Sequence, residues 1–234
     1  MTYILLIETS TIVCSAALAC DGKVVAMRES QERLSHAGQL TMFIESIMKE
    51  TGISFDQIDA VAVSKGPGSF TGLRIGVSTA KGICYALDKP LIAIGTLISM
   101  ASGFIQTNKT MIGPNDLLCP MIDARRMEVY LSVFDTRLAS LKETEAVVID
   151  EQLFGSELTR QVIWFFGDGA PKCRGLLSHQ PNARIVDHFL PSAAFLAGMA
   201  HEAFISKLFV DTSYFEPFYL KDFVAALPRV KGLR

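Results

Sequence analysis

Residues 64–72 read SKGPGSFTG, a glycine-rich turn between a short apolar strand and a helical pattern at 71–87. A turn that enters a helix offers free backbone N–H groups and the positive end of the helix dipole, which together favour anions. Gly66 and Gly68 would let the backbone approach a ligand closely, and Ser69 can cap the helix. The spacing differs from the dinucleotide fingerprint and lacks the lysine of a P-loop. Two interpretations stay open: an anion-binding loop, or a tight turn that requires small residues.

The sequence on either side of this turn predicts a mixed sheet with helices against it. Apolar runs at 3–7, 13–20 and 23–29 predict three strands, and Asp21-Gly22 between the last two suits a type I′ hairpin turn. Residues 36–50 follow the spacing of an amphipathic helix, with apolar side chains at Leu40, Phe43, Ile44, Ile47 and Met48. The first hundred residues therefore read as βββαβαβα.

The second half of the chain repeats this pattern approximately. A polar segment at 106–116 contains a Gly-Pro pair and is the best linker candidate. After it the sequence predicts strands at 117–122, 127–135, 145–149 and 162–166, and a helix at 192–209. In both halves the first strand ends in an acidic residue, Glu8 or Asp123, and a later strand ends in a Gly-x-Gly turn. We therefore expect an α/β protein of two lobes, residues 1–107 and 108–234, in which the chain's end packs back on the first lobe.

The strand-end turns of the two lobes are the candidate ligand site. Carboxylates at Glu8 and Asp123 could hold a hydrated magnesium ion, since Mg²⁺ prefers carboxylate and water oxygens. The Gly-x-Gly turns could face a nucleotide across a cleft. The residues of this candidate site are Glu8, Thr9, Ser10, Gly66, Gly68, Ser69, Asp123, Gly167 and Gly169. At Arg125 and Arg126, next to Asp123, pairing with nearby carboxylates is favoured narrowly over ligand binding.

The helix after the glycine-rich turn carries a stripe of small residues. Gly72, Gly76 and Ala80 recur every fourth position and give one smooth face, along which another helix can come close. Packing inside the same lobe and docking of a partner are about equally supported by this pattern. Arg74 lies near the turn, where it could pair with an anion or remain solvated.

Composition excludes several classes of function. The 22 basic and 24 acidic residues give a net charge of −2, whereas an autonomous nucleic-acid binder normally carries a basic excess. The sequence lacks an apolar run of membrane-spanning length and a secretory signal, and its five scattered cysteines are typical of reduced thiols. The four histidines show no metal-binding spacing, which makes a metalloprotease remote. We expect a cytoplasmic protein without membrane contact.

Three motifs closely resemble the TsaB (formerly YeaZ) family. They are ETST at 8–11, SKGPGSFTGLRIG at 64–76 and IDARRMEVY at 122–130, and GDGA at 167–170 and PFYL at 217–220 add weaker matches in the same order. The resemblance spans nearly the whole chain. It implies two RNase H-like lobes of the actin-like ATPase superfamily, with mixed sheets flanked by helices.

The resemblance also implies a role. TsaB proteins pair with the related subunit TsaD and with the ATPase TsaE to form N6-threonylcarbamoyladenosine in tRNAs that read codons starting with A. TsaD carries the metal and the transferase activity. The resemblance thus implies an accessory subunit that is not itself an enzyme, has no metal or cofactor, and meets tRNA only through the complex. A homodimer in the absence of TsaD is left open.

The family's dimerisation surface lies on the helices of the first lobe. Carried onto this sequence, it predicts a partner interface at His36, Leu40, Phe43, Gly72, Arg74, Gly76 and Ala80. The superfamily's first phosphate loop usually has Asp where this chain has Glu8, and Asp123-Ala124-Arg125 replaces a glycine-rich second loop. Both departures make the nucleotide site vestigial. The alternative hypothesis is an ATP-dependent kinase or acyl-transferase of the same superfamily.

Overall fold

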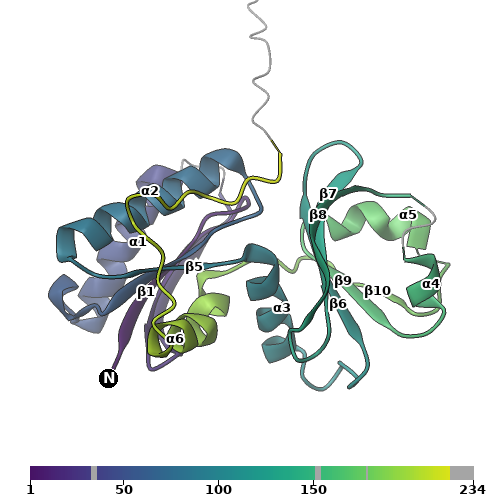
Figure 1. The fold of residues 1–234 in the computed structure, drawn as a ribbon, viewed down its shortest axis with the longest axis horizontal. Helices are drawn as coiled ribbons and strands as arrows, with labels where there is room; N and C mark the ends of the chain where they lie inside the picture. Colours follow the sequence, from purple (N-terminus) through teal and green to yellow (C-terminus); the bar gives the residue numbers. More distant parts are fainter. Residues whose placement is uncertain (33–35, 151–153, 178, 222–234) are drawn as a thin grey trace, which may run out of the picture.

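The computed structural model describes residues 1–32, 36–150, 154–177 and 179–221, and it contains two five-stranded sheets (Figure 1). All strands of the first sheet lie between residues 3 and 94, and those of the second between 117 and 185. The end of the predicted second lobe, 222–234, lies outside the described residues. The predicted α/β fold with two mixed sheets flanked by helices is confirmed.

The first sheet has the strand order β3-β2-β1-β4-β5. Its strands are β1 Tyr3–Glu8, β2 Cys14–Cys20, β3 Lys23–Ser30, β4 Ala60–Ser64 and β5 Leu91–Ile94. Strands β1, β2 and β3 pair antiparallel, whereas β1, β4 and β5 run parallel. Asp21 and Gly22, between β2 and β3, both have positive φ (48° and 77°), as the predicted type I′ turn requires.

Helices cover both faces of the first sheet. On one face lie α1 His36–Thr51 and α2 Phe70–Leu87, whose apolar sides pack on β1, β2 and β4; the short turn η1 Phe55–Gln57 precedes β4. The other face is covered by η3 Ala193–Leu196 and α6 Ala197–Ile205, which come from the far end of the sequence (Figure 1). The first sheet therefore depends on the last part of the described chain to cover one of its two faces.

The second sheet repeats the order of the first, as β8-β7-β6-β9-β10. Its strands are β6 Leu117–Asp123, β7 Glu128–Phe134, β8 Ser140–Val148, β9 Ile163–Phe166 and β10 Ala183–Ile185. The short helices α4 Gly155–Leu158, η2 Ala170–Cys173 and α5 Arg174–Leu177 border the core on one face. The sequence did not predict β10, α4 or α5, because each has only three or four residues and cannot establish a period.

Helix α3, Thr96–Thr107, connects the two sheets. It follows β5 directly, yet its apolar side packs on the second sheet, where Phe104 stacks on Phe166 at 4.2 Å between ring centroids. Gly103 of α3 also lies against Phe195 of η3: a Cβ at Gly103 would be 2.3 Å from the phenyl ring. Both crossings of the chain between the sheets therefore meet at α3 (Figure 1).

Candidate functional site

The first strand-end turn is closed off by the protein itself. Glu8 is the last residue of β1 and Thr9 and Ser10 follow it, and all three are at most 1% exposed. Glu8 Oε1 accepts a hydrogen bond from the Ser10 N–H at 2.6 Å. Burial raises the pKa of the Glu8 carboxyl, and hydrogen bonds from Ser10 oppose this increase only in part. These side chains are therefore inaccessible to a ligand from solvent.

The glycine-rich turn is what covers them. The Ser69 N–H donates to the Ser10 carbonyl at 2.6 Å. A Cβ at Gly68 would lie 2.3 Å from the Ser10 carbonyl oxygen, and a Cβ at Gly72 would lie 2.1 Å from that of Thr9. Small residues are thus required by the close approach of two backbone segments, which accounts for the glycines without a bound anion.

Ser69 and Gly66 hold this turn in place. The Ser69 hydroxyl caps α2 by accepting from the Gly72 N–H at 3.3 Å, as the sequence predicts. Gly66 has a φ of +115°, and a Cβ there would be 2.6 Å from the Phe218 carbonyl oxygen. The Phe218 N–H in turn donates to the Lys65 carbonyl at 2.7 Å. The turn is therefore also covered by residues 211–221, which we call the C-terminal segment.

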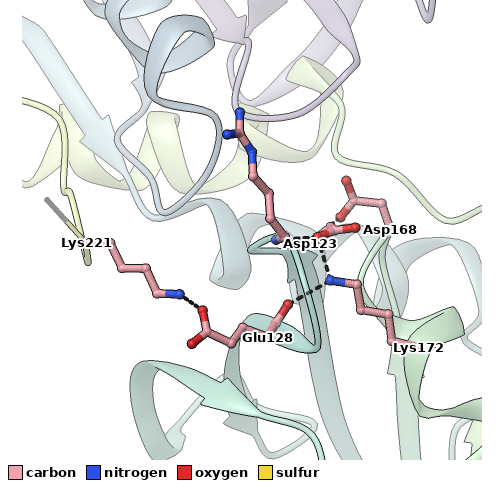
Figure 2. A network of polar contacts seen from close by, with 6 residues as sticks. Asp123, Glu128, Asp168, Lys172 and Lys221 are labelled. Atoms are coloured by element: carbon pink, nitrogen blue, oxygen red, sulfur yellow. Dashed lines mark hydrogen bonds and ion pairs between the residues drawn. The ribbon is translucent and has the colours of Figure 1, made fainter. Parts of the chain in front are cut away.

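The second strand-end turn carries a network of charged groups (Figure 2). Asp123, at the end of β6, accepts hydrogen bonds at Oδ1 from the Arg125 N–H and the Lys172 Nζ, each at 2.6 Å. Its own N–H donates to Asp168 Oδ1 at 2.9 Å. Lys172 Nζ also donates to the Glu128 carbonyl at 2.9 Å. The carboxylates of this turn are therefore held by neighbouring side chains of the same chain.

Asp168 and Glu128 extend the network to other elements. Burial raises the pKa of the Asp168 carboxyl, while the hydrogen bond from the Asp123 N–H opposes the increase. The Glu128 carboxylate forms an ion pair with Lys221, as Figure 2 shows. Among the described residues, the ion-pair partners of Asp123 and Glu128 are thus lysines rather than the two arginines favoured by sequence.

The Gly-x-Gly turn after β9 packs against β6. Gly167 has a φ of +107°, and a Cβ there would lie 2.0 Å from the Met121 carbonyl oxygen. A Cβ at Gly169 would lie 2.9 Å from Val129 Cγ1. As in the first lobe, these two glycines are required because a side chain at either position would collide with a neighbouring strand or turn. The vestigial nucleotide site stays a prediction.

The predicted partner interface divides into inward and outward residues. Leu40, Gly72, Gly76 and Ala80 are buried in the first lobe, so their side chains are inaccessible to a partner in this structure. The physical reason lies in Thr9, since a Cβ at Gly76 would lie 2.3 Å from Thr9 Oγ1. The small-residue stripe lets α2 lie close to its own sheet and first turn.

The other predicted interface residues lie at the surface. His36 and Phe43 are half-buried on α1, and the His36 Nε2 lies 2.9 Å from the Thr11 carbonyl oxygen. Arg74 is exposed on α2, with its guanidinium carbon 4.3 Å from the centre of the Phe70 ring. Its Nε donates to the Tyr219 hydroxyl at 3.3 Å. These residues remain candidates for partner contact.

Two large exposed side chains on the same helices were missed by sequence reasoning. Met42 on α1 is 60% exposed and Tyr85 on α2 is 90% exposed. A signal for Met42 exists in the sequence, because the apolar stripe of α1 leaves this position on its polar side. Both side chains are therefore largely accessible to a partner.

The C-terminal segment runs along α2. Lys81 Nζ donates to the carbonyls of Ser213 and Phe215 at 3.3 and 3.1 Å. Between segment and helix lies a cavity of about 370 Å³, lined in part by Arg74, Lys81 and Tyr219. The segment therefore lies along the side of α2 that carries Arg74, Ser78 and Lys81.

The described residues contain neither a cluster of metal ligands nor a helix that could span a membrane. Within ranges 1–32, 36–150, 154–177 and 179–221, no three His, Cys, Asp or Glu side chains are grouped so that they could hold a metal ion. None of the helices in those ranges has the length and apolar character needed to cross a membrane.

Comparison with known proteins gives one full-length family. The chain is 34% identical to the tRNA threonylcarbamoyladenosine biosynthesis protein TsaB of Escherichia coli K12 over 232 residues, which cover 95% of this chain and 96% of that protein. It is 29% identical to the Haemophilus influenzae protein of the same name, covering 94% and 93% of the two chains. The chain belongs to the TsaB family.

Solved structures agree with this TsaB-family assignment. YeaZ from Pseudomonas aeruginosa superposes with a TM-score of 0.77 at 25% identity, covering 94% of this chain and 100% of that one. A second P. aeruginosa structure, titled as an uncharacterised protein similar to peptidase YEAZ, superposes at 0.80 with 24% identity and the same coverage. The shared fold confirms the two-lobe prediction made from the TsaB resemblance.

The TsaB-family chain also shares a region with TsaD. The family model described as TsaD, tRNA N6-adenosine threonylcarbamoyltransferase, matches residues 29–161. A transferase of that name from Geobacillus thermodenitrificans is 36% identical over 108 residues, which cover 39% of this chain and 32% of that protein. The likeness to TsaD is therefore partial, whereas the likeness to TsaB runs from end to end.

Proposed function

We propose that this chain acts in the biosynthesis of threonylcarbamoyladenosine in tRNA, as a subunit that pairs with a TsaD-type transferase. The observation that carries the proposal is the end-to-end match to TsaB of E. coli, whose name states that pathway. The net charge of −2 supports a role in which tRNA is met through the complex. A TsaE-type ATPase is the second proposed partner, and the cytoplasm is the proposed location.

The proposed role is non-catalytic. In support, the carboxylates at both strand-end turns are occupied: Glu8 is buried under the glycine-rich turn, and Asp123 is held by Lys172 and the Arg125 N–H. A group that abstracts or donates a proton in catalysis must reach the substrate within hydrogen-bond distance. Glu8 is closed to a substrate, and Asp123 would first have to exchange its present partners.

We propose the solvent-exposed sides of α1 and α2 as the TsaD-docking surface. Its exposed apolar side chains Met42 and Tyr85 support this choice, because apolar and aromatic residues at the centre of an interface contribute most to binding. His36 and Phe43 would add to this surface, while Arg74 lies at its edge beside Tyr219. Two copies of the chain could use the same surface, so a homodimer would exclude TsaD.

We keep 1–107 and 108–234 as the proposed division into lobes. The division is supported by the two sheets, because each is built only from strands within one of these ranges. Residues 192–220 would then belong to the second lobe by sequence while completing the first by packing. The two lobes are thus proposed to be one folding unit with a shared core.

Reconstitution tests the proposed function. The cognate TsaD and TsaE, a threonylcarbamoyl-adenylate synthase, ATP and tRNA are combined with and without this chain, and the modified nucleoside is quantified by mass spectrometry. We expect modification to require the chain. An unchanged yield without it would contradict the proposal, and binding of Mg-ATP by the isolated chain would then favour the kinase or acyl-transferase alternative.

A further inference from the structure

A group of buried oxygen atoms without hydrogen-bond partners lies at the carboxyl end of the parallel strands of the first sheet. Glu8 Oε2, Ser10 Oγ and Ser64 Oγ have no partner among the described residues, and the same holds for Thr96 Oγ1. All four residues are 0% exposed. Such atoms are rare in folded proteins, and each requires a physical explanation such as an ion or a water molecule.

The topology brings these atoms together. Ile7 pairs with Val63 across β1 and β4, so the next residues, Glu8 and Ser64, are neighbours at the strand ends. The Ser10 N–H bonds to Glu8 Oε1, and the hydroxyls of Ser10 and Ser64 lie close enough to the Glu8 carboxylate to favour its charged form. The group therefore consists of oxygen donors gathered around one carboxylate.

Thr96 belongs to the same edge of the sheet. Its N–H donates to the Gly66 carbonyl at 2.9 Å, directly beyond the end of β4. The η3 segment closes the group from the other side, because the Ala193 N–H donates to the hydroxyl of Ser15, which is the antiparallel partner of Glu8. The enclosure of the oxygen group is therefore completed by the first residues of α3 and η3, the two elements at which the chain crosses between the sheets.

Among the described residues, the Glu8 carboxylate has no cationic partner. Burial raises the pKa of Glu8 more than the neighbouring groups of Ser10, Ser64 and Thr9 lower it, and no lysine or arginine of the described chain contributes. The charge of Glu8 helps to raise the pKa of the buried Cys14 thiol, after desolvation by burial. An ionised carboxylate in such surroundings is unfavourable by several kcal/mol unless a positive charge is supplied.

We propose that this enclosure binds one dehydrated monovalent cation, such as potassium or sodium, with Glu8 Oε2 as the charged ligand and the hydroxyls of Ser10 and Ser64 as neutral ligands. The charge of a single carboxylate balances a single positive charge. Mg²⁺ dehydrates reluctantly and usually keeps several waters. A fully buried enclosure without a second carboxylate is therefore suited to an ion that sheds its water easily.

Thermal unfolding of the full chain tests the site. The melting temperature is measured in potassium or sodium chloride and in tetramethylammonium chloride of equal ionic strength, for the wild type and the isosteric variant Glu8→Gln. Glu143→Gln, which removes an exposed carboxylate on β8, is the matched control. We expect potassium or sodium to raise the melting temperature of the wild type and of Glu143→Gln, and to leave Glu8→Gln unchanged.

Two results would overturn the proposal. Equal melting temperatures of the wild type in all three salts, or an equal response of Glu8→Gln, would mean that water fills the enclosure. If Glu8→Gln does not fold, Ser64→Ala keeps the carboxylate and should weaken the salt response several-fold. An anomalous-scattering peak beside Glu8 in crystals soaked with rubidium is the direct observation, and its absence at saturating rubidium would also count against the site.

Discussion

Thr9 sets how closely α2 can approach the first turn. Its Oγ1 donates to the Gly72 carbonyl at 2.8 Å, which gives the buried hydroxyl a partner. The same oxygen lies where a side chain at Gly76 would begin, 2.3 Å from the position of a Cβ. Thr9 therefore explains two glycines of a helix of low intrinsic propensity: its hydroxyl excludes a side chain at position 76, and its carbonyl oxygen excludes one at position 72.

A pair of substitutions on α2 checks this explanation. Gly76→Ala should lower the free energy of unfolding by about 1–3 kcal/mol, because its methyl group overpacks the core at Thr9. Gly82→Ala meets nothing within 4 Å and should raise it by about 0.5–1 kcal/mol through helix propensity alone. Urea unfolding measures both. A Gly76→Ala variant as stable as the wild type would contradict the assigned contact, and Thr9→Ala should relieve the Gly76→Ala defect.

The end of α6 shows what periodicity cannot predict. The sequence pattern extends this helix to residue 209, whereas the structure ends it at Ile205. Lys207 takes a left-handed φ of 54°, the Leu208 N–H donates to the Ala203 carbonyl at 2.8 Å, and the Lys207 N–H donates to that of Phe204 at 3.1 Å. This is a Schellman motif, in which the left-handed residue after the helix is usually a glycine. With lysine in that position, the sequence carries no stop signal.

Replacing this lysine should stabilise the protein. Lys207→Gly removes the steric cost of a left-handed L-residue and should raise the free energy of unfolding by about 0.5–1 kcal/mol. Lys207→Ala removes the same charge but keeps the steric cost, so it separates the two effects and should give no gain. Chemical denaturation of the three proteins measures the difference; equal gains in both variants would indicate a charge effect instead.

Strands and long helices were predictable because each has a period that its own residues establish. The hairpin at Asp21-Gly22 was predictable because its turn chemistry is local. What each buried face packs against was not. The small face of α2 reads equally well as an interface and as a core contact, and only Thr9 decides between them. The buried oxygen group around Glu8 likewise arises from strand register, which sequence pattern alone does not fix.

At the scale of the whole molecule, the two sheets have exchanged covering elements. Helix α3 follows a strand of the first sheet and packs on the second, while η3 and α6 follow the second sheet and pack on the first. The exposed sides of α1 and α2 carry the apolar side chains Met42 and Tyr85, and the C-terminal segment lies along α2 at Lys81, one turn before Tyr85.

If TsaD docks on the exposed sides of α1 and α2, a charge introduced there should weaken binding, whereas a charge introduced elsewhere should not. Met42→Asp should weaken TsaD binding by about 2 kcal/mol, or roughly thirtyfold in Kd, because it places a charge in the proposed interface core. Leu141→Asp changes a side chain of similar exposure, 58%, on β8 of the other sheet and should leave the Kd unchanged. Calorimetric titration with TsaD gives both values. Equal Kd values for the two variants would place the interface elsewhere.

The exchange of covering elements also sets an order of events during synthesis. A ribosome releases the amino end first, at about 5–20 residues per second. Strands β1 to β5 are therefore complete long before Ala193–Ile205 emerges, and until then Ile4, Leu6 and Ile92 have no cover. The nascent first sheet is open on one side for most of translation. A chain truncated before residue 193 would keep that apolar side exposed permanently, which makes it a substrate for chaperones and proteases rather than a smaller working protein.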